Sequence, residues 1–385
     1  RNGTSGPQCS TMTIHRRDAP RIVILKSPTI RERLSAAAVW FRYTKESGSW
    51  TPGHVPGWAP GEILTRAHWH GIRALRGIAE TPCLRPDGSI LAERGYDLDT
   101  RLSLELSDTF PPAPDHPTQD DARAAADALV DVVADFPFAG DAHRAAWVAS
   151  VLTPLARHGF EGPAPLFLFD ANTRGSGKSL LADAVSIIVS GRTMPRTAAT
   201  LDDEEMRKKI TTLAIAADPM ILFDNIEGKF GTPALDMALT ADTWKDRMLG
   251  VNEQVCLPLV AAWYATGNNV QIRGDLVRRV CYCRLESPEE KPEERTGFAH
   301  PDLLGWMRTQ RPRLVCSVLT ILSGYAAAGR PDMALPAWGR FEGWSAVVRS
   351  AVAWAGLPDP AGTRIQLAEE SDARTTARQN LLRGI

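Results

Sequence analysis

A short segment near the middle of the chain combines the residue types that bind phosphate. Gly175-Ser176-Gly177-Lys178-Ser179 follows the apolar run Leu166–Phe169 and precedes a stretch with helical character. Small residues let a loop turn its backbone N–H groups toward phosphate oxygens, and the positive end of the next helix adds to the attraction. We predict an ATP site here, in which Lys178 reaches the β- and γ-phosphates and Ser179 ligates Mg²⁺.

The loop departs from the full phosphate-loop pattern at one position. A Gly is usual six residues before the Lys, where this chain has Asn172. Asn adopts a left-handed backbone more readily than most residues, so we expect Asn172 to replace the Gly. The residues predicted to bind the nucleotide are Asn172, Gly175, Ser176, Gly177, Lys178, Ser179 and Leu180.

A second apolar run ends in a carboxylate. Met220–Phe223 is followed by Asp224 and Asn225, and Asp224 lies 46 positions after Lys178. In phosphate-loop enzymes a neighbouring strand supplies the Asp that helps to hold Mg²⁺. An isolated Asp at this place would only mark the end of a strand, but the phosphate loop before it favours a metal role. We predict that Ser179 and Asp224 hold the metal.

Two further segments carry candidate catalytic groups. The run Leu259–Ala265 leads into Asn268, a candidate for contacting the γ-phosphate and orienting water, whereas the alternative is a simple turn. Arg278 and Arg279 are candidates for an arginine finger, which stabilises charge in phosphoryl transfer and can act in trans. The alternative for this pair is an ordinary surface. The predicted catalytic residues are Lys178, Asp224, Asn225, Asn268, Arg278 and Arg279.

The elements around these motifs indicate an α/β fold. Short continuous apolar runs are typical of buried parallel strands, and helices between them predict a parallel sheet flanked by helices. A Pro-rich linker at 110–117 precedes helices expected at 119–135 and 141–157, the first capped by Thr118. From residue 301 the chain is again helical. We predict an ATPase core over 111–300 and a helical, lid-like or winged-helix-like region over 301–385.

The first part of the chain has a different character. Residues 1–80 contain 12 Lys/Arg and 5 Asp/Glu, whereas residues 81–140 contain 4 and 12. A basic segment suits nucleic acid or an acidic partner, and an ordinary solvated surface is the alternative. We expect a strand at 21–25, helices at 30–43 and 60–75 around a loop at 44–61, and a strand–turn–strand at 84–91. Together they predict a small α+β accessory domain over 1–110.

Composition excludes several classes of protein. The chain has 385 residues, of which 44% are hydrophobic and 23% charged, so it has the composition of a folded globular protein. It contains no run of about 18 apolar residues and no secretory signal, which predicts no membrane span and a cytoplasmic location. None of its six Cys forms a CxxC pair. Cys281 and Cys283, with His300 as the one nearby partner, lack the ligands of a zinc site, so we expect buried, reduced thiols.

The motifs, in this order and spacing, resemble AAA+ ATPases, and residues 110–360 look like the ATPase module of replicative helicases from phages and integrated mobile elements. That resemblance implies ATP and Mg²⁺ as cofactors, single-stranded or forked DNA as partner, a homo-hexamer, and a primase encoded elsewhere. It is carried by Asp170–Leu181, Asp202–Lys209, Leu222–Gly228, Leu239–Gly250, Ala265–Asn269 and Arg273–Arg279.

A hairpin precedes the Asn268 strand. Residues 244–250 and 253–257 flank a Gly-Val-Asn turn, with Asn252 near its tip. In the helicases that the chain resembles, a hairpin at this point projects into the central channel. The resemblance therefore implies that Lys245 or Arg247 contacts DNA phosphates. The alternative is that both are solvated strand positions or contact neighbouring subunits.

One residue departs from the wider AAA+ pattern. A Glu that polarises water usually follows the strand-end Asp, and this chain has Asn225 there. Glu205 or Glu227 is a candidate substitute, or Asn225 positions the water without acting as a base. Two alternatives to a helicase motor therefore stay open, namely a nucleotide-binding switch or helicase loader with weak hydrolysis, and an inactive remnant of a mobile element.

Overall fold

The computed structural model describes residues 20, 22–23, 25–66, 69–247, 254–364 and 367. The chain divides into two compact units at Ala74/Leu75, whereas the sequence placed the boundary at 110. Residues 75–110 belong to the second unit because they pack into it. Leu84 is fully buried in its main core, and Arg311 Nη2 donates a hydrogen bond of 2.7 Å to Thr81 Oγ1.

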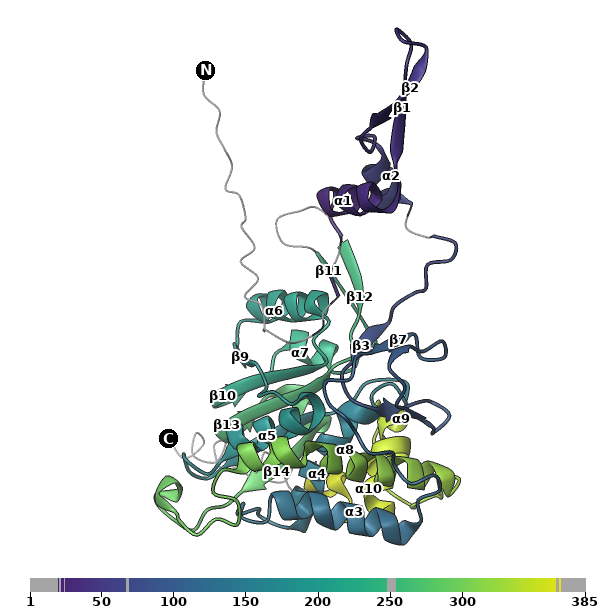
Figure 1. The fold of residues 1–385 in the computed structure, drawn as a ribbon. Coiled ribbons are helices and arrows are strands. Elements are labelled where there is room, and N and C mark those ends of the chain that lie inside the picture. Colours follow the sequence, from purple (N-terminus) through teal and green to yellow (C-terminus); the bar gives the residue numbers. More distant parts are fainter. Residues whose placement is uncertain are drawn as a thin grey trace, which may run out of the picture. The chain divides into compact units, whose positions relative to one another are not determined.

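The first unit consists of two short helices and one hairpin (Figure 1). Helix α1 spans Ser27–Ala37 and α2 spans Ala59–Thr65. Strands β1 (Trp40–Thr44) and β2 (Ser49–Gly53) pair antiparallel, so the expected helix at 30–43 stops early and the expected loop at 44–61 contains a strand. Aromatic and β-branched residues from 40 to 44 favour a strand over a helix. Residues 22, 23 and 25 form no strand, and 21 and 24 lie outside the described residues.

Short strands begin the second unit. β4 (Cys83–Leu84) and β5 (Ile90–Leu91) pair antiparallel, which confirms the expected strand–turn–strand at 84–91. β3 (Gly77–Ala79), β7 (Leu102–Leu104) and β6 (Gly95–Tyr96) form a separate three-stranded sheet in that order. None of these strands joins the large sheet, and Leu102 and Leu104 of β7 form a small separate core with Cys83 and Leu91.

The large sheet confirms the predicted α/β architecture. Five parallel strands lie in the order β14-β8-β13-β10-β9. Their bounds are Val280–Leu285, Leu166–Ala171, Ala262–Ile272, Met220–Phe230 and Arg196–Ala198. The three apolar runs identified in the sequence become the adjacent strands β8, β13 and β10. The carboxyl end of β8 therefore lies beside Asn268, within β13, and Ser179, just beyond the loop that follows β8, contacts Asp224, within β10.

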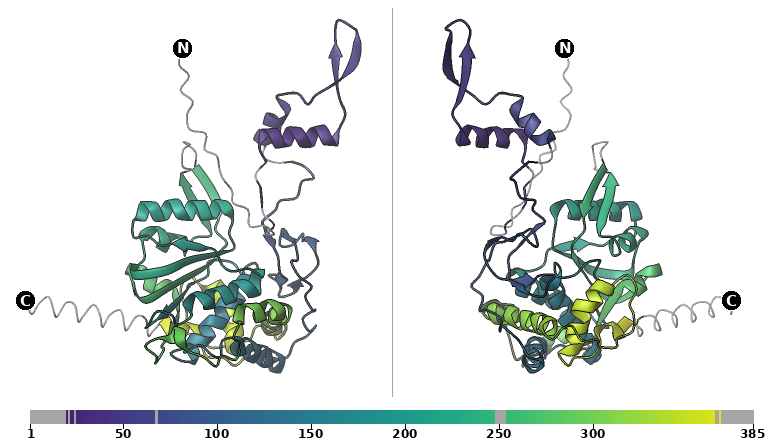
Figure 2. Two further views of the ribbon diagram at one scale, coloured as in Figure 1. Left: turned by 60° about the vertical axis from the view of Figure 1, so that its left-hand side comes forward. Right: turned by 90° about the vertical axis from the view of Figure 1, so that its right-hand side faces the viewer.

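Helices cover both faces of this sheet (Figures 1 and 2). Successive side chains of a strand point to opposite faces. Phe167 and Phe169 therefore belong to one core, with α3 (Gln119–Val132), α4 (Asp141–Ala156), α5 (Lys178–Ser190) and α8 (Leu303–Ala327). Leu166 and Leu168 belong to a second core on the other face, with α6 (Asp203–Ala216) and α7 (Pro233–Ala238). The sheet is the middle layer of three.

The helices at both ends of the second unit share one core. Thr118 caps α3 as predicted, in a capping box with Asp121. After α8 the chain continues through α9 (Glu342–Trp344), a π-helical turn (Ser345–Arg349) and α10 (Ser350–Trp354). Trp344 lies in the core that α3 and α4 form, and its Nε1 donates to Thr153 Oγ1 at 2.9 Å. The described residues from 303 to 327 and from 342 to 354 are thus helical, an irregular segment separates them, and both helical parts pack into the main core.

The expected hairpin before β13 is also present. β11 (Thr243–Arg247) pairs antiparallel with β12 (Gln254–Pro258), while its turn, including Asn252, lies outside the described residues. Trp244 is buried, and its Nε1 donates to Thr211 Oγ1 of α6 at 2.8 Å. One face of the hairpin is therefore fixed on α6. Over the part of the chain that is described, no helix has the length and apolar character needed to cross a bilayer.

Candidate functional site

The Gly-rich segment forms an open loop between β8 and α5. Gly175 and Gly177 have φ values of 76° and 89°, in the left-handed region that favours Gly. Gly177 is the residue that precedes α5, and no side chain caps this helix. The first N–H groups of α5 are therefore available to an anion, together with the positive end of the helix. The sequence predicted this geometry correctly.

Lys178 lies inside this loop rather than on its surface. Its Nζ donates to Asn268 Oδ1 at 2.7 Å and to Thr173 O at 3.3 Å. Burial lowers the pKa of Lys178, and the nearby Asp170 carboxylate opposes that shift. The ammonium is thus positioned by two neutral oxygens and has no carboxylate within ion-pair distance in the described structure. A phosphate group would give it the negative partner that it lacks.

The Asp224 carboxylate, which lies within β10 rather than at the strand end expected from the sequence, is brought to the start of α5. Ser179 Oγ donates to Asp224 Oδ1 at 3.0 Å, and Thr266 Oγ1 on β13 donates to the same oxygen. Two oxygens of the type that Mg²⁺ prefers are therefore adjacent, and their role as metal ligands stays a prediction. Thr266 is a residue that the sequence did not single out. It also accepts a hydrogen bond of 2.9 Å from the Asn225 backbone N–H, so it orients two consecutive residues within β10.

Arg196 is a second residue that sequence reasoning missed. It lies on β9 and bridges two carboxylates, with Nε to Asp224 Oδ2 at 3.1 Å and Nη2 to Asp183 Oδ2 at 2.6 Å. Asp183 is nearly buried and also accepts from the Met194 backbone N–H. Because β9 is only three residues long, its apolar pattern is too short to identify it as a strand beside β10.

Asn172 has a different role from the predicted one. Its φ is not positive, so it does not replace Gly through a left-handed backbone. Instead its side chain pairs with the backbone of Ser287, donating from Nδ2 to the carbonyl at 2.9 Å and accepting from the N–H at 3.1 Å. Asn172 therefore fixes the start of the loop to the chain beyond β14. Both polar atoms of the Asn172 amide already form these hydrogen bonds in the absence of a nucleotide.

A buried ionic network joins the strands next to the Gly-rich loop. Arg284 on β14 pairs with Asp170 on β8 at 2.7 Å and donates to Asn269 Oδ1 on β13 at 2.8 Å. Burial raises the pKa of Asp170, while the Arg284 charge and a hydrogen bond from Tyr282 oppose that shift. The network joins the carboxyl ends of three adjacent strands. A charged residue inside the apolar run 280–285 is the feature that could have revealed it.

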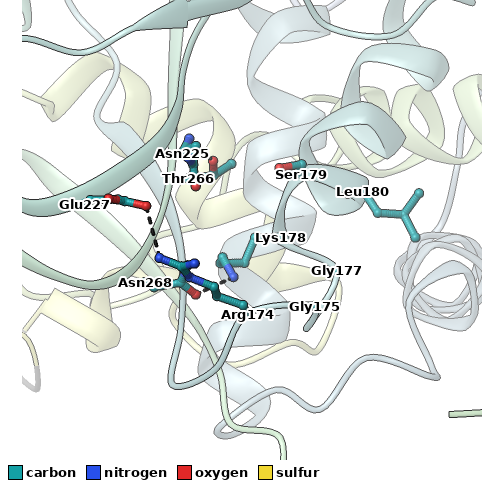
Figure 3. Close-up of a pocket in the computed structure, with 10 residues that line it drawn as sticks. All are labelled: Arg174, Gly175, Gly177, Lys178, Ser179, Leu180, Asn225, Glu227, Thr266 and Asn268. Atoms are coloured by element: carbon teal, nitrogen blue, oxygen red, sulfur yellow. Dashed lines mark hydrogen bonds and ion pairs between the residues drawn. The ribbon is translucent and has the colours of Figure 1, made fainter. Parts of the chain in front are cut away.

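Lys178, Ser179 and Thr266 line a cavity of about 420 Å³ at the carboxyl edge of the sheet (Figure 3), whereas Asp224 is not among its lining residues. Asn225, with φ of 57°, and Asn268 also line it, and their catalytic role stays a prediction. Glu227 lies at its exposed rim, where it pairs with Arg174 at 3.2 Å. Glu205 is not among the lining residues and pairs with Lys208 on α6 instead. Of the two candidate substitutes for the missing Glu, only Glu227 is at the cavity.

An acidic segment lies against the loop. Residues 286–295 contain five Glu, one Lys and one Arg, and the short 3₁₀ helix Pro292–Glu294 lies within them. The side chain of Glu293 occupies the space that a β-carbon on Gly175 would need. On the other side, Phe136 lies 2.7 Å from the position of a β-carbon on Gly177. Both glycines are therefore required by their backbone conformation, and at Gly177 the Phe136 ring also leaves no room for a β-carbon.

The two candidate finger arginines differ in their surroundings. Both lie in the 3₁₀ helix Gly274–Arg279 that follows β13. Arg279 pairs with Asp236 of α7 at 2.6 Å and is half-buried. Arg278 is exposed and forms no ion pair with the described residues. Only Arg278 is therefore available to a neighbouring molecule.

The hairpin residues and the cysteines lie away from the cavity. Lys245 and Arg247 are on the exposed face of β11, whereas Trp244 and Asp246 contact α6. Cys281 and Cys283 are buried free thiols on one face of β14, and His300 stacks on Trp306. No cluster of metal-binding side chains occurs among the residues that the structure describes. The expectation of buried, reduced thiols agrees with this environment.

Comparison with known proteins adds little. No protein-family model matches the chain, and no curated protein does either. Among solved structures, it is similar to the apo NrS-1 C-terminal region, with 9% identity, coverage of 76% of this chain and 69% of that one, and a TM-score of 0.36. A structure of JCV helicase is 15% identical, with coverages of 63% and 68% and a TM-score of 0.26. Such TM-scores support no assignment of fold or function.

Proposed function

We propose that this chain is an Mg²⁺-dependent ATPase of the AAA+ class that works on nucleic acid, as the motor of a DNA helicase from a phage or mobile element. One observation carries the proposal. Four polar side chains from α5, β10 and β13 come together beside the loop that contains the positive-φ residues Gly175 and Gly177. They are Lys178, Ser179, Asp224 and Asn268. This is the set of groups that phosphoryl transfer requires, namely a cation, a metal site, a polar amide and an N–H cradle.

The residues fit the expected ligands. The loop N–H groups and Lys178 would hold the β- and γ-phosphates, and Ser179 and Asp224 would hold Mg²⁺, which supplies charge neutralisation on the phosphate oxygens. Asn268, already hydrogen-bonded to Lys178, would lie beside the terminal phosphate and orient a water molecule. Catalysis would then depend on positioning and on electrostatic stabilisation.

Sheet topology supports an AAA+ core. Numbered along the chain, the five parallel strands lie in the order 5-1-4-3-2, with the loop-bearing β8 between β14 and β13. In open α/β sheets, ligands bind at the carboxyl edge where the strand order reverses. The cavity lies at that place.

Action on DNA is the less direct part of the proposal. The hairpin β11–β12 enters β13 with only three residues between, and its exposed face carries Lys245 and Arg247. The exposed Arg278 favours a ring of subunits. In such a ring the hairpin would contact the DNA strand, and Arg278 would complete the ATP site of the neighbouring subunit. We propose that the chain acts as a homo-hexamer on single-stranded or forked DNA. It would work in the cytoplasm with a primase that is encoded separately.

A second function is favoured by one observation. Asn225 stands where a catalytic Glu is usual, and Glu227, the acidic residue at the cavity rim, is engaged with Arg174. A protein without a general base would bind ATP and hydrolyse it slowly. The chain would then act as a nucleotide-dependent switch or a helicase loader.

The test is ATP hydrolysis with and without single-stranded DNA, in wild type and in Lys178→Ala. Removal of one such electrostatic group costs roughly 100-fold or more in rate. We expect DNA-stimulated turnover in wild type and its loss in the variant. Wild-type turnover by Lys178→Ala would overturn the site. Tight ATP binding with turnover that stays slow at every DNA concentration would establish the switch.

A further inference from the structure

The first unit carries an unusual number of exposed apolar side chains. Ten of the sixteen large apolar residues that are exposed in the described structure lie between residues 22 and 72. Its own buried core is small and includes Ile30, Val55 and Ala59. Exposed apolar surface on this scale, relative to the rest of the chain, indicates an interaction site.

The hairpin β1–β2 concentrates aromatic side chains on one face. Phe41 pairs with Pro52, and Tyr43 pairs with Trp50, so these four side chains share a face by the alternation of strands. The three aromatic residues are 56%, 48% and 67% exposed. Tyr43 and Trp50 contact each other edge to face, with ring centroids 5.4 Å apart. We call Phe41, Tyr43, Trp50 and Pro52 the aromatic face.

The hairpin contacts the helices of the first unit through Trp40 at its start and not through the aromatic face. Trp40 is half-buried, and its Nε1 donates to Leu34 O of α1 at 3.0 Å. Within the first unit the rest of the hairpin extends away from α1 and α2 (Figures 1 and 2). The aromatic face is therefore not used to build the unit that carries it.

The first unit has an excess of positive charge. The face of the hairpin opposite the aromatic face carries Arg42, and the turn after β1 carries Lys45 and Glu46. Residues 22–74 contain seven Lys/Arg and three Asp/Glu. The strands contain no Leu, Ile, Val or Met, the aliphatic residues that would fill pockets of a protein partner.

We propose that the aromatic face is a stacking platform for single-stranded nucleic acid, with Lys45 of the adjacent turn near the phosphate backbone. Proteins that bind single strands without sequence preference combine aromatic stacking with a cationic path for the backbone. Phe41 and Tyr43, two residues apart on one strand, offer rings to successive bases. The inference rests on the proposed function and gives the motor a second strand contact, in addition to that proposed for Lys245 and Arg247.

Two double variants distinguish base stacking from apolar contact with a protein partner, because one removes the aromatic rings and the other keeps them. Phe41→Leu/Trp50→Leu retains apolar surface, and Phe41→Tyr/Trp50→Phe retains both rings. The full-length chain is titrated into a fluorescent oligo-dT strand and its anisotropy is measured. Because each stacked base contributes roughly a five- to 100-fold gain in affinity, the Leu pair should weaken binding at least tenfold. The ring-retaining pair should stay within about threefold of wild type.

A control in the same unit tests specificity for the hairpin. Trp58 is 63% exposed and lies outside the hairpin, so Trp58→Leu should leave oligo-dT affinity unchanged. Equal affinity of wild type and the Leu pair would overturn the proposal, as would absence of oligo-dT binding by wild type. Loss of self-association in the Leu pair, without loss of oligo-dT binding, would make the face a protein interface instead.

The same variants separate this inference from the proposed function. Hydrolysis of ATP without DNA depends on the Lys178 site and should be unchanged in the Leu pair. If wild type binds oligo-dT through the aromatic face but hydrolyses no ATP, the motor assignment fails and the platform stands. If hydrolysis is normal and the Leu pair binds oligo-dT as wild type does, the platform fails and the ATPase stands.

Discussion

Ser179 Oγ and Asp224 Oδ1 lie 3.0 Å apart although 45 residues separate them in the chain. Ser179 lies in the first turn of α5 and Asp224 lies within β10, and the fold places the two elements side by side. The oxygen pair therefore exists before any ligand binds. A bound metal would require the Ser179 hydroxyl hydrogen to turn away from Asp224 Oδ1, which also accepts from Thr266 Oγ1.

Substituting Asp224 should affect metal dependence before nucleotide affinity. Asp224→Asn retains the size of the side chain but removes the charge that would hold Mg²⁺. We expect turnover to fall about 100-fold or more, with saturation only at higher Mg²⁺ concentrations. Binding of a fluorescent ATP analogue in EDTA should be unchanged, which serves as the control. Normal turnover at low Mg²⁺ would remove Asp224 from the metal site.

Glu293 should oppose binding of the triphosphate. Its side chain lies against Gly175, so its charge would stand within several ångströms of the phosphates. Repulsion of that kind is worth roughly 1 kcal/mol in a solvated setting. Glu293→Gln should therefore lower the KM for ATP about two- to fivefold, with kcat nearly unchanged, and the gain should shrink at high salt.

Glu290→Gln is the matched control for this prediction. It makes the same change in charge on the same segment, and Glu290 is not among the close neighbours of the loop glycines. An equal effect of the two variants would mean that only net charge matters. No effect of Glu293→Gln would show that the segment leaves the loop when ATP binds.

The two arginines after β13 should separate into a catalytic and a structural role. Arg278→Ala should lower turnover about 10³-fold, as loss of an arginine finger does, without changing Tm. Arg279→Ala should instead destabilise the fold by about 1 kcal/mol, since it removes the half-buried partner of Asp236. Calorimetry and turnover measured on both variants make the comparison.

Mixing experiments test whether Arg278 acts in trans. Subunits with Arg278→Ala and subunits with Lys178→Ala are each inactive but should form some complete sites when mixed. Partial recovery of turnover is expected. If activity never returns, and the protein stays monomeric with ATP and DNA, the trans role is wrong.

The hairpin β11–β12 should contribute to DNA affinity through charge alone. Removing one cation that binds a DNA phosphate lowers the salt slope of binding by about one unit, so Lys245→Ala/Arg247→Ala should lower it by up to two. Hydrolysis without DNA should be preserved. Lys208→Ala, on α6 beside two Glu side chains, is the control and should leave the slope unchanged. An unaltered slope in the double variant would exclude this hairpin from the DNA path.

His158 should make the fold sensitive to mild acid. Burial lowers its pKa to about 4, and the charges of Arg76 and Arg157 act in the same direction. Its Nδ1 is buried without a hydrogen-bond partner in the described structure. Below about pH 6.5 the unfolded chain binds a proton that the folded one does not, so stability is lost as pH falls toward 4. At pH 5 the loss is about 2 kcal/mol.

Urea unfolding at pH 7 and pH 5 measures this effect. In His158→Gln, the decrease in unfolding free energy between the two values should be about 2 kcal/mol smaller than in wild type. His116 is exposed, and His116→Gln should keep the wild-type decrease. Equal pH dependence in wild type and His158→Gln would mean that the ring is solvated when the chain is folded.

Elements that depend on contiguous residues could be predicted from the sequence. The strand, Gly-rich loop and helix from 166 to 190 follow one another directly, so their geometry is encoded locally. The same is true of the α3 cap at Thr118 and the hairpin before β13. The strand end expected at Asp224 was wrong, because β10 continues to Phe230. The helix expected at 30–43 was wrong past residue 37, because cross-strand pairing of aromatic residues outweighed helical periodicity there.

The partner of each polar side chain, in contrast, depends on how distant segments pack together. Asn172 pairs with Ser287, 115 residues away, and Arg284 pairs with Asp170, 114 residues away. Arg279 forms an ion pair with Asp236, whereas Arg278 is exposed. The fold also places the Glu293 side chain against Gly175. Hydrogen bonds and ion pairs act over a few ångströms, so they depend on the order of strands in the sheet. Local patterns of residue type carry no record of that order.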